Sequence, residues 1–369
     1  MSLNNYLFSD GLYCLMRPRA YLLRAYLLIV IWRRPNTEQR SMLPRRWRKR
    51  VGKPTASALQ SKATALRSNI GLVIVGKSEV VELALTALLA RGHVLIEDVP
   101  GLGKTLLARA LARSIDGRFQ RVQFTPDLLP SDVTGTAIYN ERDRTFEFRP
   151  GPVFANIFLG DELNRATPRT QSSLLEAMEE RQVTADGQTH PLPSLFFVIA
   201  TQNPVEQQGV YPLPEAQLDR FLMRLSVGYP EQADEETIVR AQLAAQPLAT
   251  LEPVATVDDV LALQQEVRRV HVDETILSYV VSLVAATRRH GDLVLGASPR
   301  ASLGLTVAAQ ALAYLEGSRF VLPDHIKRLA VPVLAHRLIL KPQSILAGVT
   351  AATIISDLLG QVPVPLSIG

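Results

Sequence analysis

Cysteine is almost absent from this sequence, because Cys14 is the only one among 369 residues. A single cysteine cannot close a disulfide within the chain, and it excludes a zinc site built from cysteine thiolates. The apolar segment at residues 21–32 has twelve residues and contains Arg24, whereas a membrane-spanning helix needs about 20 apolar residues. We therefore expect a cytoplasmic protein without a membrane span, since reducing compartments keep thiols unpaired.

Basic charge is concentrated at one end of the chain. Residues 1–53 hold twelve Lys or Arg against Asp10 and Glu38, whereas the other residues hold 28 basic and 33 acidic side chains. The body is therefore mildly acidic, and the basic overall charge is poor evidence that it binds nucleic acid. We interpret residues 1–53 as a basic leader that is either disordered or translated upstream of a native start such as Met42. The alternative is an arm that binds RNA or a membrane surface.

A glycine-rich loop at residues 98–105 (Asp-Val-Pro-Gly-Leu-Gly-Lys-Thr) lies between an apolar run at 94–97 and a helical pattern at 104–114. A strand, a glycine-rich loop and a helix in this order are typical of a phosphate-binding site. The first position departs from the motif, which has glycine where this chain has Asp98. A surface loop that only caps a helix is the alternative.

The residue types of this loop suit a nucleotide. Gly101 and Gly103 allow the backbone to curl until its N–H groups converge on an anion, and the helix that follows directs its positive end there. Lys104 is expected to reach the β- and γ-phosphates, and the hydroxyl of Thr105 is expected to hold Mg²⁺. The loop thus predicts ATP and Mg²⁺ as the bound groups.

Short apolar runs alternate with helical patterns in a predicted domain at residues 54–229. Such alternation predicts a parallel sheet that is covered on both faces and binds ligands beyond the carboxyl ends of its strands. The expected strands are 94–97, 121–124, 156–159, 194–201 and 221–227, and the expected helices are 57–69, 78–91, 104–114 and 168–181. Two predicted hairpins, with strands at 134–139 and 145–148 and a turn within 183–189, are either loop decoration or elements that touch a substrate or partner.

Polar side chains follow two of the expected strands. Asp161 and Glu162 come directly after the run at 156–159, and Asn203 follows the run at 194–201. In phosphate-binding-loop enzymes such an aspartate holds Mg²⁺, a neighbouring glutamate can act as general base, and an amide can orient the attacking water. Ordinary solvated acids and an Asn-Pro turn are the alternatives.

The strands are expected to stop after residue 230, and residues 230–369 are predicted to form a helical lid. The expected helices are 257–270, 273–290, 299–316, 324–340 and 343–359, and Thr256 with Asp259 is typical of a capping box. Arg300 falls in the first turn of one of them, where a cation costs about 0.3–1 kcal/mol against the helix dipole unless an anion lies nearby. Arg300 is thus a candidate phosphate contact, and a tolerated exposed arginine is the alternative.

These motifs resemble an AAA+ ATPase of the MoxR family, and the resemblance covers about residues 67–365. Its most specific stretches are 92–105 (GHVLIEDVPGLGKT), 161–166 (DELNRA), 171–181 (QSSLLEAMEER), 200–204 (ATQNP) and 213–221 (LPEAQLDRF). In that family Asp98 is a usual variant of the first loop position. The resemblance implies an α/β P-loop core with a five-stranded parallel sheet, hairpin insertions and a C-terminal all-α lid.

The resemblance also implies roles for single residues. It assigns Lys104 and Thr105 to Walker A, Asp161 and Glu162 to Walker B, Asn203 to sensor 1 and Arg300 to sensor 2, which reaches the γ-phosphate from the lid. Arg220 is the expected arginine finger for a neighbouring subunit's ATP, with Arg165 and Arg169 as competitors and an ordinary solvated arginine as the alternative. The implied nucleotide contacts are Val75, Gly76, Pro100, Gly101, Leu102, Gly103, Lys104, Thr105 and Leu106, and the implied metal ligands are Thr105 and Asp161.

The function implied by the resemblance is ATP-driven remodelling, maturation or activation of client protein complexes. The implied assembly is a homo-oligomeric ring, expected to be a hexamer, with a von Willebrand factor A-domain protein as partner. A DNA-handling AAA+ motor and an ATP-gated scaffold with little turnover are the alternatives. The acidic body and the lack of a DNA-reading module speak against the first, and the intact set of Lys104, Asp161, Glu162 and Asn203 speaks against the second.

Overall fold

The computed structural model describes residues 58–185, 187–204, 209–244 and 246–364, and the structural statements below refer to these residues. The predictions for residues 1–53, including the basic leader and the apolar segment at 21–32, lie outside them. The described residues all belong to one compact unit, Thr55–Gly369. Among the described residues, no helix is long and apolar enough to cross a membrane.

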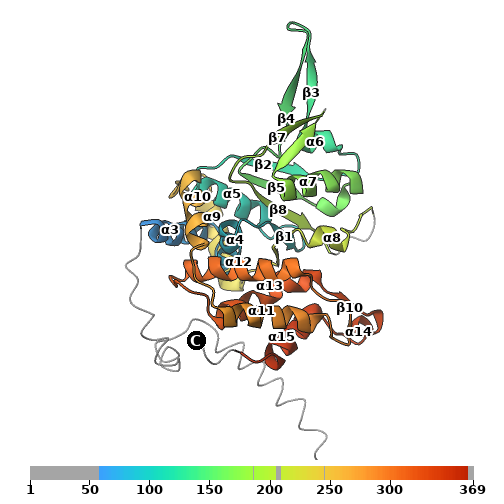
Figure 1. Ribbon diagram of the computed structural model, residues 1–369. Coiled ribbons are helices and arrows are strands. Elements are labelled where there is room, and N and C mark those ends of the chain that lie inside the picture. The colour runs from blue at the N-terminus through green and yellow to red at the C-terminus, as the bar shows by residue number, and fades with distance from the viewer. Residues whose placement is uncertain (1–57, 186, 205–208, 245, 365–369) are drawn as a thin grey trace, which may run out of the picture. The chain divides into compact units, whose positions relative to one another are not determined.

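A five-stranded parallel sheet forms the centre of this unit, as Figure 1 shows. Its strand order is β2-β5-β8-β1-β9. The strands are β2 (Phe119–Gln123), β5 (Ile157–Asp161), β8 (Phe197–Gln202), β1 (Val94–Glu97) and β9 (Met223–Leu225). This confirms the predicted sheet, and we call the side where the strands end the carboxyl edge and the side where they begin the amino edge.

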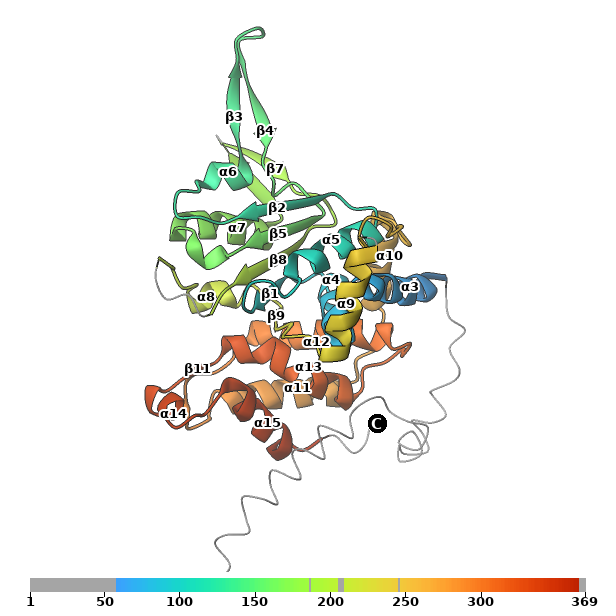
Figure 2. The same ribbon diagram turned by 180° about the vertical axis from the view of Figure 1, so that it is seen from behind.

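Successive residues of the central strands enter two different hydrophobic clusters, because side chains alternate between the faces of a sheet. Val94 and Ile96 pack in one cluster with α3 (Ala58–Val73), α4 (Ser78–Leu89) and α5 (Lys104–Ser114). Leu95 packs in the other, against α7 (Pro168–Glu180) and α6 (Pro130–Thr134), and Figure 2 shows these helices from behind. Both faces of the central strands are therefore buried, which explains the continuous apolar runs in the sequence.

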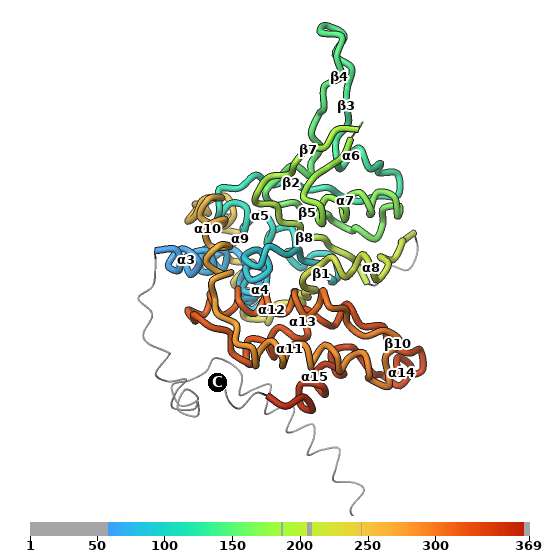
Figure 3. The backbone as a smooth tube through the Cα atoms, in the orientation of Figure 1, coloured from blue at the N-terminus to red at the C-terminus, as the bar shows by residue number. Residues whose placement is uncertain are grey.

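Both predicted hairpins are present. The first pairs β3 (Gly135–Asn140) with β4 (Thr145–Pro150), and the second pairs β6 (Gln182–Ala185) with β7 (Gln188–Pro191). Phe148 and His190 stack with ring centroids 3.8 Å apart, so the two hairpins touch. The tube in Figure 3 shows that β3 and β4 extend well beyond the sheet and its helices.

The region after residue 230 is mainly helical, but its helices differ from the prediction in three places. The helices are α9 (Gln232–Ala244), α10 (Val257–Val267), α11 (Glu274–Thr287), α12 (Pro299–Leu315), α13 (Pro323–Leu334), α14 (Pro342–Leu346) and α15 (Ala351–Gln361). We did not expect α9, and the helix expected at 343–359 is interrupted near Gly348, whose φ is +79°. The helix expected at 324–340 ends at Leu334, and the next residues form the 3₁₀ turn η3 (Ala335–Arg337).

The expectation that strands stop after residue 230 is wrong in one detail. A short antiparallel ribbon joins β10 (Leu293–Leu295) to β11 (Ile339–Leu340). Strands of two and three residues carry too little alternation to be recognised from sequence. The capping box of α10 is confirmed, because Thr256 N donates to Asp259 Oδ2 at 2.9 Å and Asp259 N donates to Thr256 Oγ1 at 3.2 Å.

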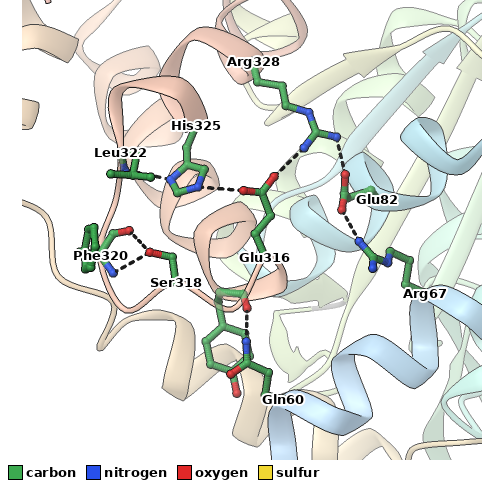
Figure 4. A network of polar contacts seen from close by, with 10 residues as sticks. Gln60, Arg67, Glu82, Glu316, Ser318, Phe320, Leu322, His325 and Arg328 are labelled. Atoms are coloured by element: carbon green, nitrogen blue, oxygen red, sulfur yellow. Dashed lines mark hydrogen bonds and ion pairs between the residues drawn. The ribbon is translucent and has the colours of Figure 1, made fainter. Parts of the chain in front are cut away.

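A network of polar side chains joins α3 and α4 to the lid helices α12 and α13 (Figure 4). Glu82, whose side chain is 10% exposed, accepts hydrogen bonds from Arg67 at 2.7 Å and from Arg328. Arg328 also donates to Glu316 at 2.8 Å, and His325 lies 3.1 Å from the same carboxylate. The network and the shared hydrophobic cluster fix these lid helices against the sheet's helical cover.

Candidate functional site

The glycine-rich loop connects the end of β1 to the start of α5, as predicted. Gly101 has a φ of +88° and Gly103 a φ of +82°, a region that side chains with a Cβ rarely adopt. A Cβ added at either glycine would meet no atom within 4 Å, so backbone shape and not crowding requires glycine here. Gly103 is the N-cap of α5, which leaves the first N–H groups of that helix directed at the loop.

Lys104 follows Gly103 as the first residue of α5 and is 9% exposed. Its Nζ donates a hydrogen bond to the backbone oxygen of Asp98 at 2.7 Å. Burial lowers the pKa of the Lys104 ammonium, and the charges of Asp161, Asp98 and Glu162 partly oppose that effect. The structure thus brings the predicted lysine and the predicted carboxylates into one electrostatic neighbourhood at the carboxyl edge.

Asp161 ends β5 and is held by two neighbouring strands. Thr201 Oγ1 of β8 donates to Asp161 Oδ1 at 2.6 Å, and Arg121 Nη2 of β2 donates to Asp161 Oδ2 at 2.7 Å. Neither Arg121 nor Thr201 is part of a sequence motif that predicts a contact with Asp161. Both lie on strands next to β5, and only the strand order could have identified them.

Glu162 has a left-handed backbone with a φ of +57°, which is uncommon for a residue with a side chain. Its N–H donates to Thr201 Oγ1 at 2.9 Å, and its carboxylate accepts from Arg165 Nη1 at 3.0 Å. Arg165, an alternative candidate for the arginine finger, thus binds Glu162 of its own chain. Asn203 follows β8 and is 7% exposed, so it also lies at the carboxyl edge.

Asp98, which replaces the usual first glycine, has a structural role in the loop. Its carboxylate accepts hydrogen bonds from Ser226 Oγ at 3.1 Å, from Gly228 N at 3.3 Å and from Val227 N. These residues follow β9 and lead into the lid. Asp98 therefore ties the glycine-rich loop to the start of the lid connection, a link that the sequence pattern did not reveal.

The predicted nucleotide contacts Val75 and Gly76 lie between α3 and α4, next to the same connection. Gly76 has a φ of +74°, and a Cβ added there would be 2.0 Å from Asp234 Oδ2 of α9. Lys77 Nζ donates to the backbone oxygen of Tyr229 at 2.8 Å. The segment is therefore closely packed against α9. Of the predicted contacts within the loop and α5, Leu102 and Leu106 pack against the hydrophobic cluster that contains α5.

Arg220 and Arg300 lie together, and away from the glycine-rich loop. Both donate to Glu179 near the end of α7, Arg220 at 3.0 Å to Oε2 and Arg300 to Oε1. Arg220 precedes β9, whose first residue, Met223, pairs with the first residue of β1. The two arginines are therefore at the amino edge, whereas Lys104 follows the carboxyl edge.

The expected role of Arg300 is a contact with the γ-phosphate from the lid, and this role stays a prediction. In this structure Arg300 lies beside Glu179. The start of α12 is held at the amino edge, because Ser298 Oγ donates to Asp219 Oδ2 at 3.2 Å. At about 3.3 Å per residue, the four residues of β1 separate the two edges by roughly 13 Å.

Comparisons with known proteins agree with this architecture. A family model described as "ATPase family associated with various cellular activities (AAA)" matches residues 93–223, and one described as "AAA lid domain" matches residues 285–358. A crystal structure of a putative ATPase from Cytophaga hutchinsonii superimposes with a TM-score of 0.79 at 39% identity, over 83% of this chain and 96% of that one.

Relatives with names point to one family. The uncharacterized protein YeaC of Bacillus subtilis is 52% identical over 298 residues, which are 81% of this chain and 93% of that protein. Chaperone MoxR1 of Mycobacterium tuberculosis is 43% identical over 302 residues, 79% of this chain and 80% of that protein. Protein MoxR of Paracoccus denitrificans is 32% identical over 296 residues, 73% of this chain and 86% of that protein. The chain therefore belongs to the MoxR family of AAA+ ATPases.

Proposed function

We propose that this protein is a Mg²⁺-dependent ATPase whose active site is shared between neighbouring subunits of a ring. The observation that supports this most is the separation of the predicted residues into two groups. Lys104, Asp161, Glu162 and Asn203 follow the strands at the carboxyl edge, whereas Arg220 and Arg300 share Glu179 at the amino edge.

The carboxyl edge fits a nucleoside triphosphate and a divalent cation. The positive φ values of Gly101 and Gly103 and the open space beside them leave backbone N–H groups free to face phosphates. Thr105 and Asp161 offer the oxygen ligands that Mg²⁺ prefers, and a bound Mg²⁺ would neutralise phosphate charge. Lys104 would exchange its bond to the Asp98 carbonyl for the phosphates.

Glu162 is the general base in this proposal. Its backbone is fixed by the hydrogen bond to Thr201, which also binds Asp161, so one threonine sets the relative position of both acids. A carboxylate held in this way can accept a proton from an attacking water. Asn203 would orient that water from the end of β8.

The arginines at the amino edge bind Glu179 of their own subunit, at the other end of the strands from the glycine-rich loop. A head-to-tail contact between copies would bring the amino edge of one subunit to the carboxyl edge of the next, and such contacts close into rings. We propose that Arg220 and Arg300 both neutralise charge on the neighbour's γ-phosphate, and that the ring is a hexamer. The biological role we propose is remodelling of client protein complexes, since one relative is named a chaperone. A von Willebrand factor A-domain protein is the partner we propose, on the family resemblance alone.

Mixing of variants tests the shared site. Glu162→Gln and Arg220→Ala should each bind ATP but hydrolyse it poorly, because they lack the base and the arginine respectively. In a ring with head-to-tail contacts, equal amounts of the two should recover about a quarter of the wild-type rate, since one contact in four then joins two intact halves. Hydrolysis per subunit should also rise with protein concentration in the wild type.

The same experiment can refute the proposal. If Arg220→Ala hydrolyses ATP at the wild-type rate, the arginine has no role in catalysis. If each variant is inactive and their mixture stays inactive, the site is not shared in this way. ATP binding without hydrolysis by the wild type at any concentration would favour an ATP-gated scaffold.

A further inference from the structure

The lid contains a buried arginine that the proposed catalytic scheme does not use. Arg337 ends the 3₁₀ turn η3, and its side chain is 3% exposed. Its Nη1 forms an ion pair with Asp219, and its Nη2 donates to the backbone oxygen of Phe221 at 2.8 Å. Arg337 thus binds the residues on both sides of Arg220.

Two more lid side chains bind the same short segment. His336 Nε2 lies 3.0 Å from the backbone oxygen of Phe221, and Ser298 Oγ donates to Asp219 at 3.2 Å. Ser298 is also the N-cap of α12 and precedes Arg300 by two residues. Asp219 therefore connects the turn that carries Arg220 to the turn that carries Arg300.

We propose that Arg337 is a positioning residue: it fixes Asp219 and Phe221 so that Arg220 and Arg300 are presented together to the neighbouring subunit's ATP. This inference rests on the proposed shared site. It makes the lid of one subunit part of the catalytic apparatus of the next, although Arg337 itself touches no reacting atom.

The chemistry of the contact favours positioning over packing. Burying an ion pair often stabilises a fold no more than apolar side chains of similar volume would, so stability alone gives little reason for a charge here. A planar guanidinium can instead bind two acceptors in fixed directions, which specifies geometry. Arg337 uses this property on Asp219 and Phe221, and its Nε donates to Val333 at 2.8 Å within the lid.

Glu179 completes the arrangement from the sheet side. Its two carboxylate oxygens bind Arg220 and Arg300 separately, so the side chains of both arginines point to one place on α7. The lid fixes the backbone of the Arg220 turn, and Glu179 of α7 orients the Arg220 side chain. Loss of the lid contact should therefore displace the arginine pair, and a displacement of about 1 Å can cost about 100-fold in rate.

Arg337→Met tests this proposal in the full-length protein. We expect hydrolysis per subunit to fall by about 10- to 100-fold while the Kd of a fluorescent ATP analogue changes less than about 2-fold, because the subunit's own carboxyl edge is intact. Arg337→Lys keeps the charge but cannot bind two acceptors in the same way, so it should show a smaller loss of rate. If the methionine variant does not fold, Arg337→Lys is the test in its place. A wild-type rate for the lysine variant would then overturn the proposal.

Mixing separates positioning from a general structural effect. Arg337→Met mixed with Glu162→Gln should recover about a quarter of the wild-type rate, whereas Arg337→Met mixed with Arg220→Ala should recover none, because both defects are in the half that acts on the neighbour. Arg328→Met is the matched control, since Arg328 is a lid arginine with two ion pairs but none near Arg220.

Each result has a definite meaning. A wild-type rate for Arg337→Met, or an equal loss in Arg328→Met, overturns the proposal. So does failure of Arg337→Met to complement Glu162→Gln under conditions where Arg220→Ala does complement it, because Arg337 would then act within its own subunit. If Arg220→Ala also fails to complement Glu162→Gln, the shared site itself falls and this inference falls with it.

Discussion

His93 is a buried histidine whose titration should lower the free energy of unfolding in mild acid. It immediately precedes β1 and is 4% exposed. Its Nδ1 accepts a hydrogen bond from Val198 N at 3.0 Å, and its Nε2 lies 3.3 Å from the carbonyl oxygen of Met178. The neutral ring with the proton on Nε2 satisfies both partners, whereas a second proton on Nδ1 would oppose the N–H of Val198.

The magnitude follows from the pKa. Burial, with a smaller effect of the charge on Arg181, lowers the pKa of His93 to about 3. An unfolded histidine has a pKa of about 6.5, so the unfolded state binds the proton first and stability falls as the pH drops from about 6.5 towards 3. At pH 5 the difference of about 1.5 pH units from the unfolded pKa corresponds to about 2 kcal/mol. His336, whose pKa burial also lowers to about 3, should contribute a similar loss.

Urea unfolding followed by circular dichroism at 222 nm measures this effect. The free energy of unfolding should be determined at pH 7 and pH 5 for the wild type and for His93→Gln. The variant removes one titrating group, so its loss between the two pH values should be smaller than that of the wild type by about 2 kcal/mol.

The comparison between two proteins removes the contribution of the carboxylates. Burial raises the pKa of Glu316, but its hydrogen bonds and attraction to His325 and Arg328 outweigh that effect and lower it. Protonation of such groups lowers the free energy of unfolding equally in both proteins, so their contribution cancels in the difference. Equal losses in the wild type and in His93→Gln would show that His93 can be protonated in the folded state, and the assignment of a neutral ring would be wrong.

Two further substitutions test the loop and the lid contact. Gly103→Ala should destabilise the loop conformation by about 1–2 kcal/mol, because φ is +82° there, and should raise the Kd for ATP about 5- to 30-fold in a binding titration. Gly360→Ala in α15 is the control. Equal ATP affinities of the two variants would refute the assigned loop geometry. Arg328→Met should lower the free energy of unfolding by about 1–3 kcal/mol, because Glu82 loses one of the two arginines that bind it. The exposed pair of Arg240 with Glu236 provides the control Arg240→Met, for which we expect at most about 0.5 kcal/mol, and a larger effect there would contradict the reasoning.

Local patterns were sufficient to predict the core of the fold. The strands flanked by glycine-rich or acidic turns were recognised because a buried parallel strand is a short apolar run and its ligands follow its carboxyl end. The hairpin of β6 and β7 and the capping box at Thr256 were likewise visible, since each depends on residues only a few positions apart. The site residues at the carboxyl edge belong to this class.

Contacts that depend on strand order and lid position could not be predicted. Arg121 binds Asp161 only because β2 lies beside β5, and Glu179 binds two arginines that are 41 and 121 positions away in sequence. The break at Gly348 was also missed, because an isolated glycine in a helical pattern is often tolerated. Sequence patterns therefore identified which residues carry charge, and packing determined which of them meet.

The short strand β9 connects both halves of the proposed shared site. The residues that follow it, from Ser226 to Gly228, bind Asp98 of the glycine-rich loop, and the segment before it carries Arg220. A three-residue strand paired with β1 along its length has little freedom to stretch or bend. Movement of the loop on binding or losing phosphate would therefore reach the Arg220 turn, where the lid is attached through Arg337. In the proposed ring, that path would lead from the nucleotide of one subunit to the nucleotide of the next.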